Sequence, residues 1–256
     1  MSNMKKIGLI PCRLESTRLP NKPLEMIGSL PMFAHVYYRS LEADLDDIYI
    51  CTDSKEIQRM SNDLNIKCIM TSKKHKNGTE RCGEAVKKLK LSSNDIVVDI
   101  QGDEPLLNPK DVSKIANNFN PKKHDILLGY LLFKEKEQKN VVKIVTAKDN
   151  RVLYFSRSDI PNTFREKTIL KKQVGLVAFS INAINDFYKS KPTKLEEIEG
   201  VELLRSVELG SAIYGIELNY ETRAVDVPAD LNFVREKIKS DSLYQKYALK
   251  NEINNK

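Results

Sequence analysis

A short basic loop near the N-terminus carries the residues best suited to chemistry on phosphate groups. Arg13, Arg18 and Lys22 lie within ten residues of one another, directly after an apolar run. A triphosphate needs a cationic clamp, because its negative charge must be neutralised before a nucleophile can approach the phosphorus, and guanidinium groups grip phosphate oxygens in pairs. An ordinary basic surface loop is the alternative, and the stiffening effect of Pro20 and Pro23 disfavours it.

Two hydroxyl side chains, Ser16 and Thr17, add hydrogen-bond donors to the same loop. The loop lacks the Gly-x-x-x-x-Gly-Lys-Ser/Thr pattern of a P-loop. Ligands of open α/β sheets bind beyond the carboxyl ends of the strands. We therefore expect a phosphate site of another kind, placed after the first strand.

Two further turns carry carboxylates that could hold a divalent cation. Asp103 lies in the segment Gln101–Pro105, which follows an apolar stretch, and a carboxylate there can hold Mg²⁺ against phosphate oxygens. Gly102 lets the backbone approach a ligand closely. Asp226 offers a second magnesium carboxylate. The alternatives are a tight turn that happens to carry acids and, for Asp226, a helix cap in front of Pro228.

The segment Asn77–Arg81 combines a glycine with a predicted helix start. Gly78 permits a turn, and Thr79 can cap the helix that Glu80 begins. A base or a phosphate could rest on that helix N-terminus. Capping alone also explains much of this pattern.

Short apolar runs alternate with amphipathic stretches along the first half of the chain. The pattern predicts strands at 7–11, 48–52, 67–70 and 95–100, and helices at 31–43, 55–64 and 80–89. Apolar strands of this kind suit a parallel sheet that is covered on both faces. The alternation therefore predicts an α/β fold with a doubly wound, mostly parallel sheet.

The pattern changes after about residue 124. Strands are predicted in quick succession at 125–133, 141–147, 151–156 and 173–180, with a hairpin turn at 148–150, one helix at 195–209 and a closing helix at 228–239. We infer an α/β domain of residues 1–124 and 216–240 and a smaller β-rich lid and association module of residues 125–215. The polar C-terminal tail, residues 241–256, is expected to fray.

Composition narrows the class of protein. Charged residues make up 30% of the 256 residues, no apolar run reaches the roughly 18 residues of a membrane span, and the first apolar run is too short for a signal peptide. The cysteines are too scattered for a zinc or disulfide framework. The net charge of +7 comes without a basic stripe interleaved with aromatics. These features predict a cytoplasmic protein with no nucleic-acid partner and no membrane insertion.

At the residues that could do chemistry, the sequence closely resembles the 3-deoxy-manno-octulosonate cytidylyltransferase (CMP-Kdo synthetase) family. The matches run in order from residue 7 to about 238, so they cover nearly the whole chain. They fall within Ile10–Leu24, Pro31–Val36, Gly78–Arg81, Gln101–Pro105, Tyr154–Arg157, Leu195–Glu199, Glu202–Arg205 and Val225–Leu231. Several motifs in register indicate the family more strongly than any single one.

The resemblance implies a nucleotide-diphospho-sugar transferase-like fold and a defined reaction. The anomeric hydroxyl of a 3-deoxy-2-ulosonic acid attacks the α-phosphate of CTP, CMP is joined to the sugar and pyrophosphate leaves, with Mg²⁺ as cofactor. The implied partners are CTP, an acidic 2-keto-3-deoxy sugar and a second copy of the chain. The implied homodimer assembles through residues 125–215, which would also bind the sugar.

The resemblance also assigns roles to individual residues. The implied catalytic residues are Arg13, Lys22 and Asp103, and the implied magnesium carboxylates are Asp103 and Asp226. The implied substrate-binding residues are Arg18, Gly78, Thr79, Arg81, Gln101, Gly102, Arg157, Gln173 and Glu202.

Two positions depart from the family pattern, and both resemble sugar contacts. Gln173 stands where the family usually has His, two residues before a glycine, and Leu203 stands where the family usually has Gln. The loss of a buried polar partner costs about 1–3 kcal/mol. The expected acceptor is therefore Kdo or a close variant such as 8-amino-Kdo.

Two other enzyme classes remain as alternatives. A cytidylyltransferase for a sialic-acid-like nonulosonate usually has Arg-x-Gly-Ser-Lys in its first loop, whereas Arg13 is followed here by Leu-Glu-Ser-Thr-Arg. A metal-dependent sugar transferase requires Asp-x-Asp after a strand. The segment Asp44–Asp46 precedes a strand instead, so a surface turn explains it better.

Overall fold

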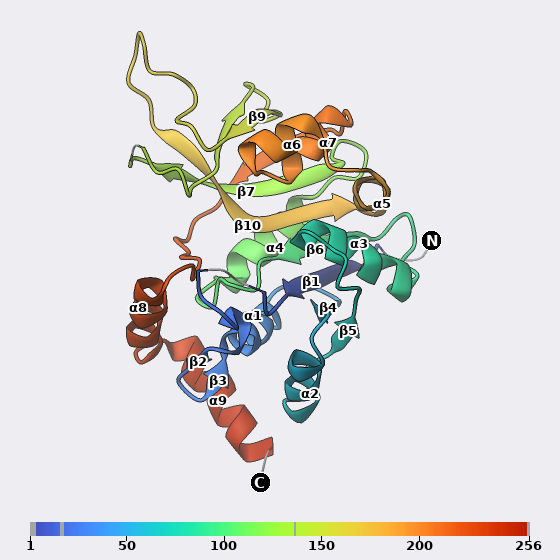
Figure 1. The fold of residues 1–256 in the computed structure, drawn as a ribbon, viewed down its shortest axis with the longest axis vertical. Coiled ribbons are helices and arrows are strands. Elements are labelled where there is room, and N and C mark those ends of the chain that lie inside the picture. The colour runs from blue at the N-terminus through green and yellow to red at the C-terminus, as the bar shows by residue number, and fades with distance from the viewer. Residues whose placement is uncertain (1–3, 16–17, 136, 255–256) are drawn as a thin grey trace.

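One twisted β-sheet forms the centre of the molecule (Figure 1). The computed structural model describes residues 4–15, 18–135 and 137–254, and side chains as far as residue 248. The strands of the main path lie in the order β11, β7, β10, β6, β1, β4, β5. Their bounds are Ile213–Glu217, Ile126–Phe133, Leu170–Ser180, Ile96–Ile100, Lys6–Cys12, Asp47–Thr52 and Cys68–Met70.

The sheet is mostly parallel, as the sequence predicts. β1 pairs in parallel with β4 and β6, β4 with β5, and β11 with β7. β10 runs antiparallel to both β6 and β7. Off the main path, β8 (Lys143–Thr146) pairs with β10 and with β9 (Val152–Ser156). The turn at 148–150 joins these two strands, which confirms the predicted hairpin.

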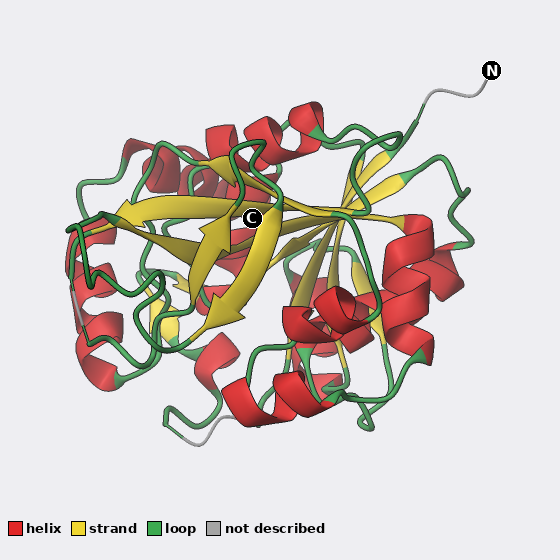
Figure 2. Cartoon of the chain, turned by 90° about the horizontal axis from the view of Figure 1, so that it is seen from above, coloured by secondary structure: helices red, strands yellow, loops and turns green. Residues whose placement is uncertain are grey.

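Helices cover both faces of the sheet, so the doubly wound prediction is confirmed (Figure 2). One apolar cluster holds residues of α1 (Met32–Ser40), α2 (Lys55–Asp63) and α4 (Pro109–Asn118). The other holds residues of α3 (Gly78–Leu89), α5 (Ile181–Lys189) and α7 (Leu203–Glu208). Strand β6 serves both: Val98 lies in the first cluster and Val97 in the second, because successive side chains point to opposite faces.

A third cluster fixes the basic loop against the end of the chain. The loop continues into a short 3₁₀ helix, η1 (Lys22–Leu24), and a small hairpin of β2 (Met26–Ile27) and β3 (Leu30–Pro31). Helix α8 (Pro228–Ile238) packs on this hairpin through Leu231 and Val234, which contact the cluster that contains Ile27. The contact brings the segment before α8 next to the basic loop.

The structure differs from the predicted elements after residue 105 in three respects. The single helix expected at 195–209 is two helices, α6 (Lys194–Glu199) and α7, because Gly200 takes a left-handed conformation with φ of +61° and ends the first. Helices α4 and α5 have no counterpart among the predicted elements. Strands β7 and β10 extend the central sheet, so residues 125–215 share that sheet with the first 124 residues.

The C-terminal residues do not fray as expected; Ser242–Asn254 form helix α9. Tyr247 is buried in the main core, and its hydroxyl lies 2.7 Å from Nδ1 of the buried His35. The polar composition of this segment gave no sign that it is attached to α1, because the attachment depends on a buried tyrosine and its hydrogen bond. None of the described helices combines the length and the apolar character of a bilayer span.

Candidate active site

The predicted basic loop and the acidic turns meet at the carboxyl ends of β1 and β6. They surround a cavity of about 650 Å³, here called the first cavity. The predicted residues that line it are Arg13, Arg18, Lys22, Gly78, Arg81, Gln101, Gly102, Asp103 and Asp226. Ser16 and Thr17, the two predicted hydroxyl donors, lie outside the described residues. Segments far apart in sequence thus build one site at the expected edge of the sheet.

Lys22 links the two predicted magnesium carboxylates. Its Nζ lies 2.7 Å from Asp103 Oδ2 and 3.4 Å from Asp226 Oδ1. Arg18 Nη2 lies 3.0 Å from the same oxygen of Asp226. The two carboxylates therefore converge on one point, and two of the three predicted clamp cations lie at that point.

The helix-cap interpretation of Asp226 does not describe this structure. The capping oxygen comes from Asp230, whose Oδ2 accepts hydrogen bonds from the backbone N–H groups of Asp226 and Val227 at 3.1 and 3.2 Å. Asp230 thus stabilises the start of α8. The Asp226 carboxylate is left to face Lys22 and Arg18.

The residues present fit a magnesium ion that arrives with a nucleotide. Among the described residues there is no group of three or more His, Cys, Asp or Glu side chains placed to hold a metal. Mg²⁺ in nucleotide sites commonly takes one or two carboxylates and completes its shell with waters and phosphate oxygens. Asp103 and Asp226, which face the same ammonium group, supply such a pair.

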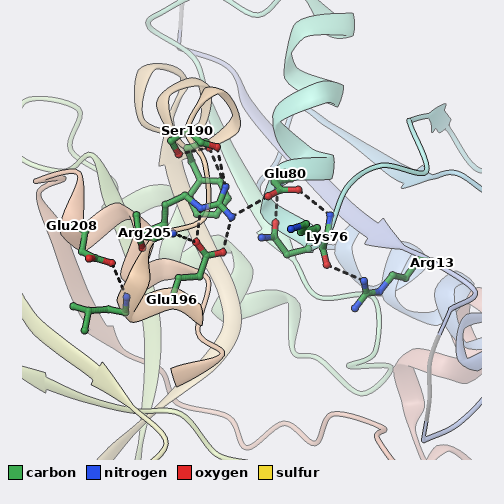
Figure 3. Close-up of polar contacts among 11 residues, drawn as sticks. Arg13, Lys76, Glu80, Ser190, Glu196, Arg205 and Glu208 are labelled. Carbon is green, nitrogen blue, oxygen red and sulfur yellow. Dashed lines mark hydrogen bonds and ion pairs between the residues drawn. The ribbon is translucent and has the colours of Figure 1, made fainter. Parts of the chain in front are cut away.

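Arg13 belongs to a chain of polar contacts that crosses from the first cavity to the opposite helices (Figure 3). Its Nη1 donates to the carbonyl of Lys76 at 3.0 Å, and the N–H of Lys76 donates to Glu80 Oε2 at 2.9 Å. The other oxygen of Glu80 accepts from Arg205 at 3.0 Å. Arg205 is fully buried and forms a two-pronged pair with Glu196 at 2.6 and 2.7 Å.

Gly102 allows the turn after β6 to lie directly against the end of β1. A Cβ atom at this position would stand 2.8 Å from Cys12 Sγ and 2.9 Å from the carbonyl oxygen of Pro11. Because the second of these atoms belongs to the backbone, a side chain would push the turn away. The glycine therefore sets the position of the neighbouring Asp103.

Two predicted residues at the start of α3 contribute differently from what their motif suggests. Asn77, and not Thr79, caps the helix, since its Oδ1 accepts the N–H of Glu80 at 2.8 Å. Arg81 is buried in the wall of the first cavity, where it donates to Thr71 Oγ1 at 2.6 Å and pairs with Asp53 at 3.3 Å. Much of the Arg81 charge is thus balanced inside the protein.

A second cavity of about 440 Å³ adjoins the first. Gln101, Asp103 and Asp226 line both, so the paired carboxylates lie at the junction. The predicted residues Thr79, Gln173 and Glu202 line the second cavity. The register of the pairing between β10 and β7 shifts between Gln173 and Val177, and such irregularities are common beside active sites.

Two carboxyl groups in the second cavity were not singled out from the sequence. Asp99 is buried in β6, and burial, together with the nearby Glu202 carboxyl, raises the pKa of Asp99 well above its usual range. Burial and the charge of Asp103 raise the pKa of Glu104 to about 7. Glu104 accepts from the N–H of Gly175 and from the Thr222 hydroxyl. The sequence offered one signal for Asp99, an acidic residue inside an otherwise apolar strand. Burial of a charged group is costly unless it is paired or hydrogen-bonded, so such a residue is a candidate for the site.

Arg157 is the predicted site residue that lines neither cavity. Its guanidinium donates to the carbonyls of Glu199 and Gly200 at 2.9 Å each, and to the carbonyl of Asn140 at 3.3 Å. Asn140 itself lines the second cavity. In this structure Arg157 therefore secures the C-terminus of α6 and the cavity wall.

Comparison with known proteins identifies the family to which the chain is similar. The family model described as "Cytidylyltransferase" matches residues 7–215. A 3-deoxy-manno-octulosonate cytidylyltransferase of Nitratidesulfovibrio vulgaris is 36% identical over 235 residues, which cover 89% of this chain and 93% of the relative. The enzyme of the same name from Vibrio vulnificus is 36% identical over 247 residues, which cover 91% and 98%.

Solved structures give the same picture. The structure of a CMP:2-keto-3-deoxy-manno-octonic acid synthetase complexed with CTP matches with a TM-score of 0.85 and 31% identity over 92% of this chain and 98% of the other. A glucose-1-phosphate thymidylyltransferase of Bacillus anthracis matches with a TM-score of 0.69 over 94% and 99%. At 14% identity, that likeness concerns the fold alone.

Proposed function

From the premise that the chain belongs to the cytidylyltransferase family, as a member of its 3-deoxy-manno-octulosonate group, we propose that it transfers CMP from CTP to the anomeric hydroxyl of a 3-deoxy-2-ulosonic acid. The observation that carries the proposal is the convergence of Lys22, Asp103 and Asp226 where two cavities meet. A nucleotide in the first cavity and a sugar in the second would bring their reacting groups to this junction.

The residues of the chain supply positioning and charge for this transfer. In the first cavity, Arg13, Arg18 and Lys22 would bind the phosphates, and Gln101 and Gly102 would form the wall behind them. The anomeric hydroxyl loses its proton to solvent as its oxygen forms a bond to the α-phosphorus, the bond to the leaving pyrophosphate oxygen breaks, and negative charge grows on that leaving group. Preorganised cations stabilise such developing charge.

Mg²⁺ is part of the proposal as the cofactor, with Asp103 and Asp226 as its protein ligands. When bound, the ion would neutralise phosphate charge and hold the phosphate oxygens in place. The convergence of both carboxylates on the Lys22 ammonium group supports this assignment.

The identity of the sugar is the finer part of the proposal. The relatives are named for Kdo, and we propose Kdo or a close variant such as 8-amino-Kdo. Leu203 is buried, and the side-chain oxygen of Gln173 is buried without a hydrogen-bond partner among the described residues. The second cavity therefore differs from the family pattern at positions that would touch the acceptor.

A homodimer in the cytoplasm completes the proposal. Large apolar side chains of the 125–215 module are exposed; they include Leu153, Phe164, Ile169 and Ile198. A second copy of the chain would cover such a surface. The four cysteines are free thiols, which suits a reducing compartment.

A pyrophosphate-release assay tests the function directly. The purified enzyme would be given CTP, Mg²⁺ and, in separate reactions, Kdo, 8-amino-Kdo and a sialic acid. We expect release with at least one of the two 3-deoxy-octulosonic acids, and none when CTP or Mg²⁺ is omitted. Release with the sialic acid alone would replace the proposal with the nonulosonate alternative.

A further inference from the structure

Glu80 reaches back from helix α3 to the loop in front of that helix. Its Oε2 accepts the backbone N–H of Lys76 at 2.9 Å. In a capping box, the third helical residue would accept from the N-cap residue, which is Asn77 here. Glu80 accepts instead from the residue before the cap, so its carboxylate holds the loop in place.

Both backbone groups of Lys76 are engaged, one by each of two charged side chains (Figure 3). The N–H donates to Glu80, and the carbonyl accepts from Arg13 Nη1 at 3.0 Å. Residues 71–77, between β5 and α3, form no regular secondary structure, so side-chain contacts set the position of Lys76. The orientation of Arg13, which lines the first cavity, therefore depends on Glu80.

The buried Arg205 holds Glu80 from the other side. Arg205 Nη2 lies 3.0 Å from Glu80 Oε1. The Arg205 side chain is fully buried; it pairs with Glu196 at 2.6 Å and lies over the Phe187 ring at 4.1 Å. One oxygen of the Glu80 carboxylate is thus attached to a fixed interior group, and the other is attached to the loop.

We propose that Glu80 is a positioning residue for the phosphate clamp and that it acts through Lys76 on Arg13. A guanidinium group has five N–H donors, so Arg13 can keep its contact with the Lys76 carbonyl and still grip phosphate oxygens. A side chain that is already held in place loses less freedom when the ligand binds. The inference rests on the proposed function, in which Arg13 binds the phosphates of CTP.

Glu80→Gln tests the contact with little change of shape. A carboxylate accepts on both oxygens, whereas an amide has one accepting oxygen and an N–H₂ group that only donates. The glutamine can therefore serve Lys76 or Arg205 in this arrangement, but not both. We expect the affinity for CTP to fall at least fivefold. Isothermal titration with CTP and Mg²⁺, without acceptor sugar, measures binding apart from the transfer step.

A double-mutant cycle shows whether the loss acts through Arg13. CTP binding would be measured for wild type, Glu80→Gln, Arg13→Ala and the double variant. Arg13→Ala should weaken binding at least fivefold, because it removes a charged donor to phosphate. In that background Glu80→Gln should change the affinity less than twofold, since no guanidinium is left to position. A role of Glu80 in the fold alone would give the same loss in both backgrounds.

A second pair of variants leaves Glu80 and the interior unchanged. Lys76→Pro removes the N–H that Glu80 accepts, whereas Lys76→Ala keeps it, and both lose the side-chain ammonium group. Lys76→Pro should bind CTP at least fivefold more weakly than Lys76→Ala. This pair keeps the test available if loss of the Glu80 charge unfolds the chain, which thermal unfolding would show.

Glu208→Gln is the matched control for the change from acid to amide. Glu208 accepts the N–H of Leu195 at 3.2 Å, and Figure 3 shows it on the far side of Arg205 from Arg13. Its affinity for CTP should stay within twofold of wild type, and the effect of Arg13→Ala should be the same with and without it.

The outcomes distinguish this inference from the proposed function. A loss below fivefold for a folded Glu80→Gln, a loss of twofold or more in the Arg13→Ala background, or equal binding by the two Lys76 variants overturns the positioning role. The cytidylyl transfer would then still stand. Absence of CTP binding by wild type overturns the proposed function itself and, with it, the positioning role.

Discussion

Charged side chains meet at the junction of the two cavities. Asp103 and Asp226 come from distant segments and share the ammonium group of Lys22. Two carboxylates that contact the same ammonium group would repel each other without that cation. We infer that Lys22 supports the pair and that, in the nucleotide complex, it shares the site with phosphate oxygens and Mg²⁺.

Replacement of either carboxylate should abolish Mg²⁺-dependent turnover. Asp103→Asn and Asp226→Asn each remove a charge that orients the phosphates, while the asparagine keeps the shape of the side chain and should leave thermal unfolding close to wild type. Pyrophosphate release over a range of Mg²⁺ concentrations measures the effect. Activity of Asp226→Asn within twofold of wild type would remove this residue from the metal site.

Replacement of the clamp lysine should be far more damaging than loss of a surface lysine. Lys22→Ala should lower turnover on the order of 10²-fold or more, as the loss of a preorganised donor to developing charge commonly does. Lys73 is exposed, so Lys73→Ala is the matched control and should stay near wild type. Similar losses for both variants would mean that overall basicity, and not a placed group, binds the anion.

Restoring the family residues should shift the sugar preference. Gln173→His with Leu203→Gln returns the polar side chains that the family usually has at positions resembling sugar contacts. We expect the ratio of kcat/KM to move toward Kdo relative to wild type. Wild-type turnover of Kdo at least tenfold above that of the variant sugar would instead identify both departures as silent repacking.

At the scale of the elements, helix α9 shows how a polar segment is held in place. The neutral imidazole of His35 accepts from the Tyr247 hydroxyl at Nδ1 and donates from Nε2 to the Ile27 carbonyl at 2.7 Å. Burial lowers the pKa of His35 to about 4. The contact between α1 and α9 therefore depends on an uncharged histidine.

Acid should weaken this contact by a defined amount. Between pH 6.5 and 4 the unfolded chain protonates His35 and the folded chain does not, so the free energy of unfolding should fall as the pH is lowered through this window. A shift of this size corresponds to about 3 kcal/mol in total. Urea unfolding of wild type and His35→Asn at several pH values checks it: the variant should be less stable at pH 7, and the difference should shrink toward pH 4. A difference that does not vary with pH would contradict the assignment.

At the scale of the whole molecule, β10 joins the two functional regions. It pairs with β6 at its C-terminal end and with β8 nearer its start, so one strand of the 125–215 module contacts both the core of the sheet and the hairpin of β8 and β9. Figure 1 shows β9, α6 and α7 at the end of the molecule opposite α8 and α9. The exposed apolar side chains of this module lie on the region through which we propose dimerisation.

The proposed homodimer can be tested in solution. Sedimentation velocity at micromolar concentration should give a mass twice the 29.3 kDa of the chain. Ile198 is 67% exposed on α6, and Ile198→Glu should shift the population toward monomer, because a charge would be buried without a partner. Ile198→Val serves as the conservative control. A wild-type monomer at these concentrations would contradict the proposal.

Local sequence determined the first strands and helices of the chain and the chemical types of the residues in the site. The apolar runs of β1 and β6 and the loops after them were evident from residues 7–22 and 95–105, because burial on both faces of a parallel strand leaves a continuous apolar pattern. The motifs also indicated Lys22 as a phosphate-clamp residue and Asp103 and Asp226 as carboxylates that converge. These features depend on neighbours along the chain or on residue type.

Only the tertiary structure decided which of these residues meet and which are occupied elsewhere. Arg157 is engaged by backbone carbonyls of α6, Asp230 takes the capping role open to Asp226, and α9 is stable because Tyr247 reaches His35. The approach of Asp99, Thr79 and Glu202 depends on strand β6 and two helices packing together. Such contacts join segments distant in sequence, and their energies depend on burial and geometry that no local pattern records.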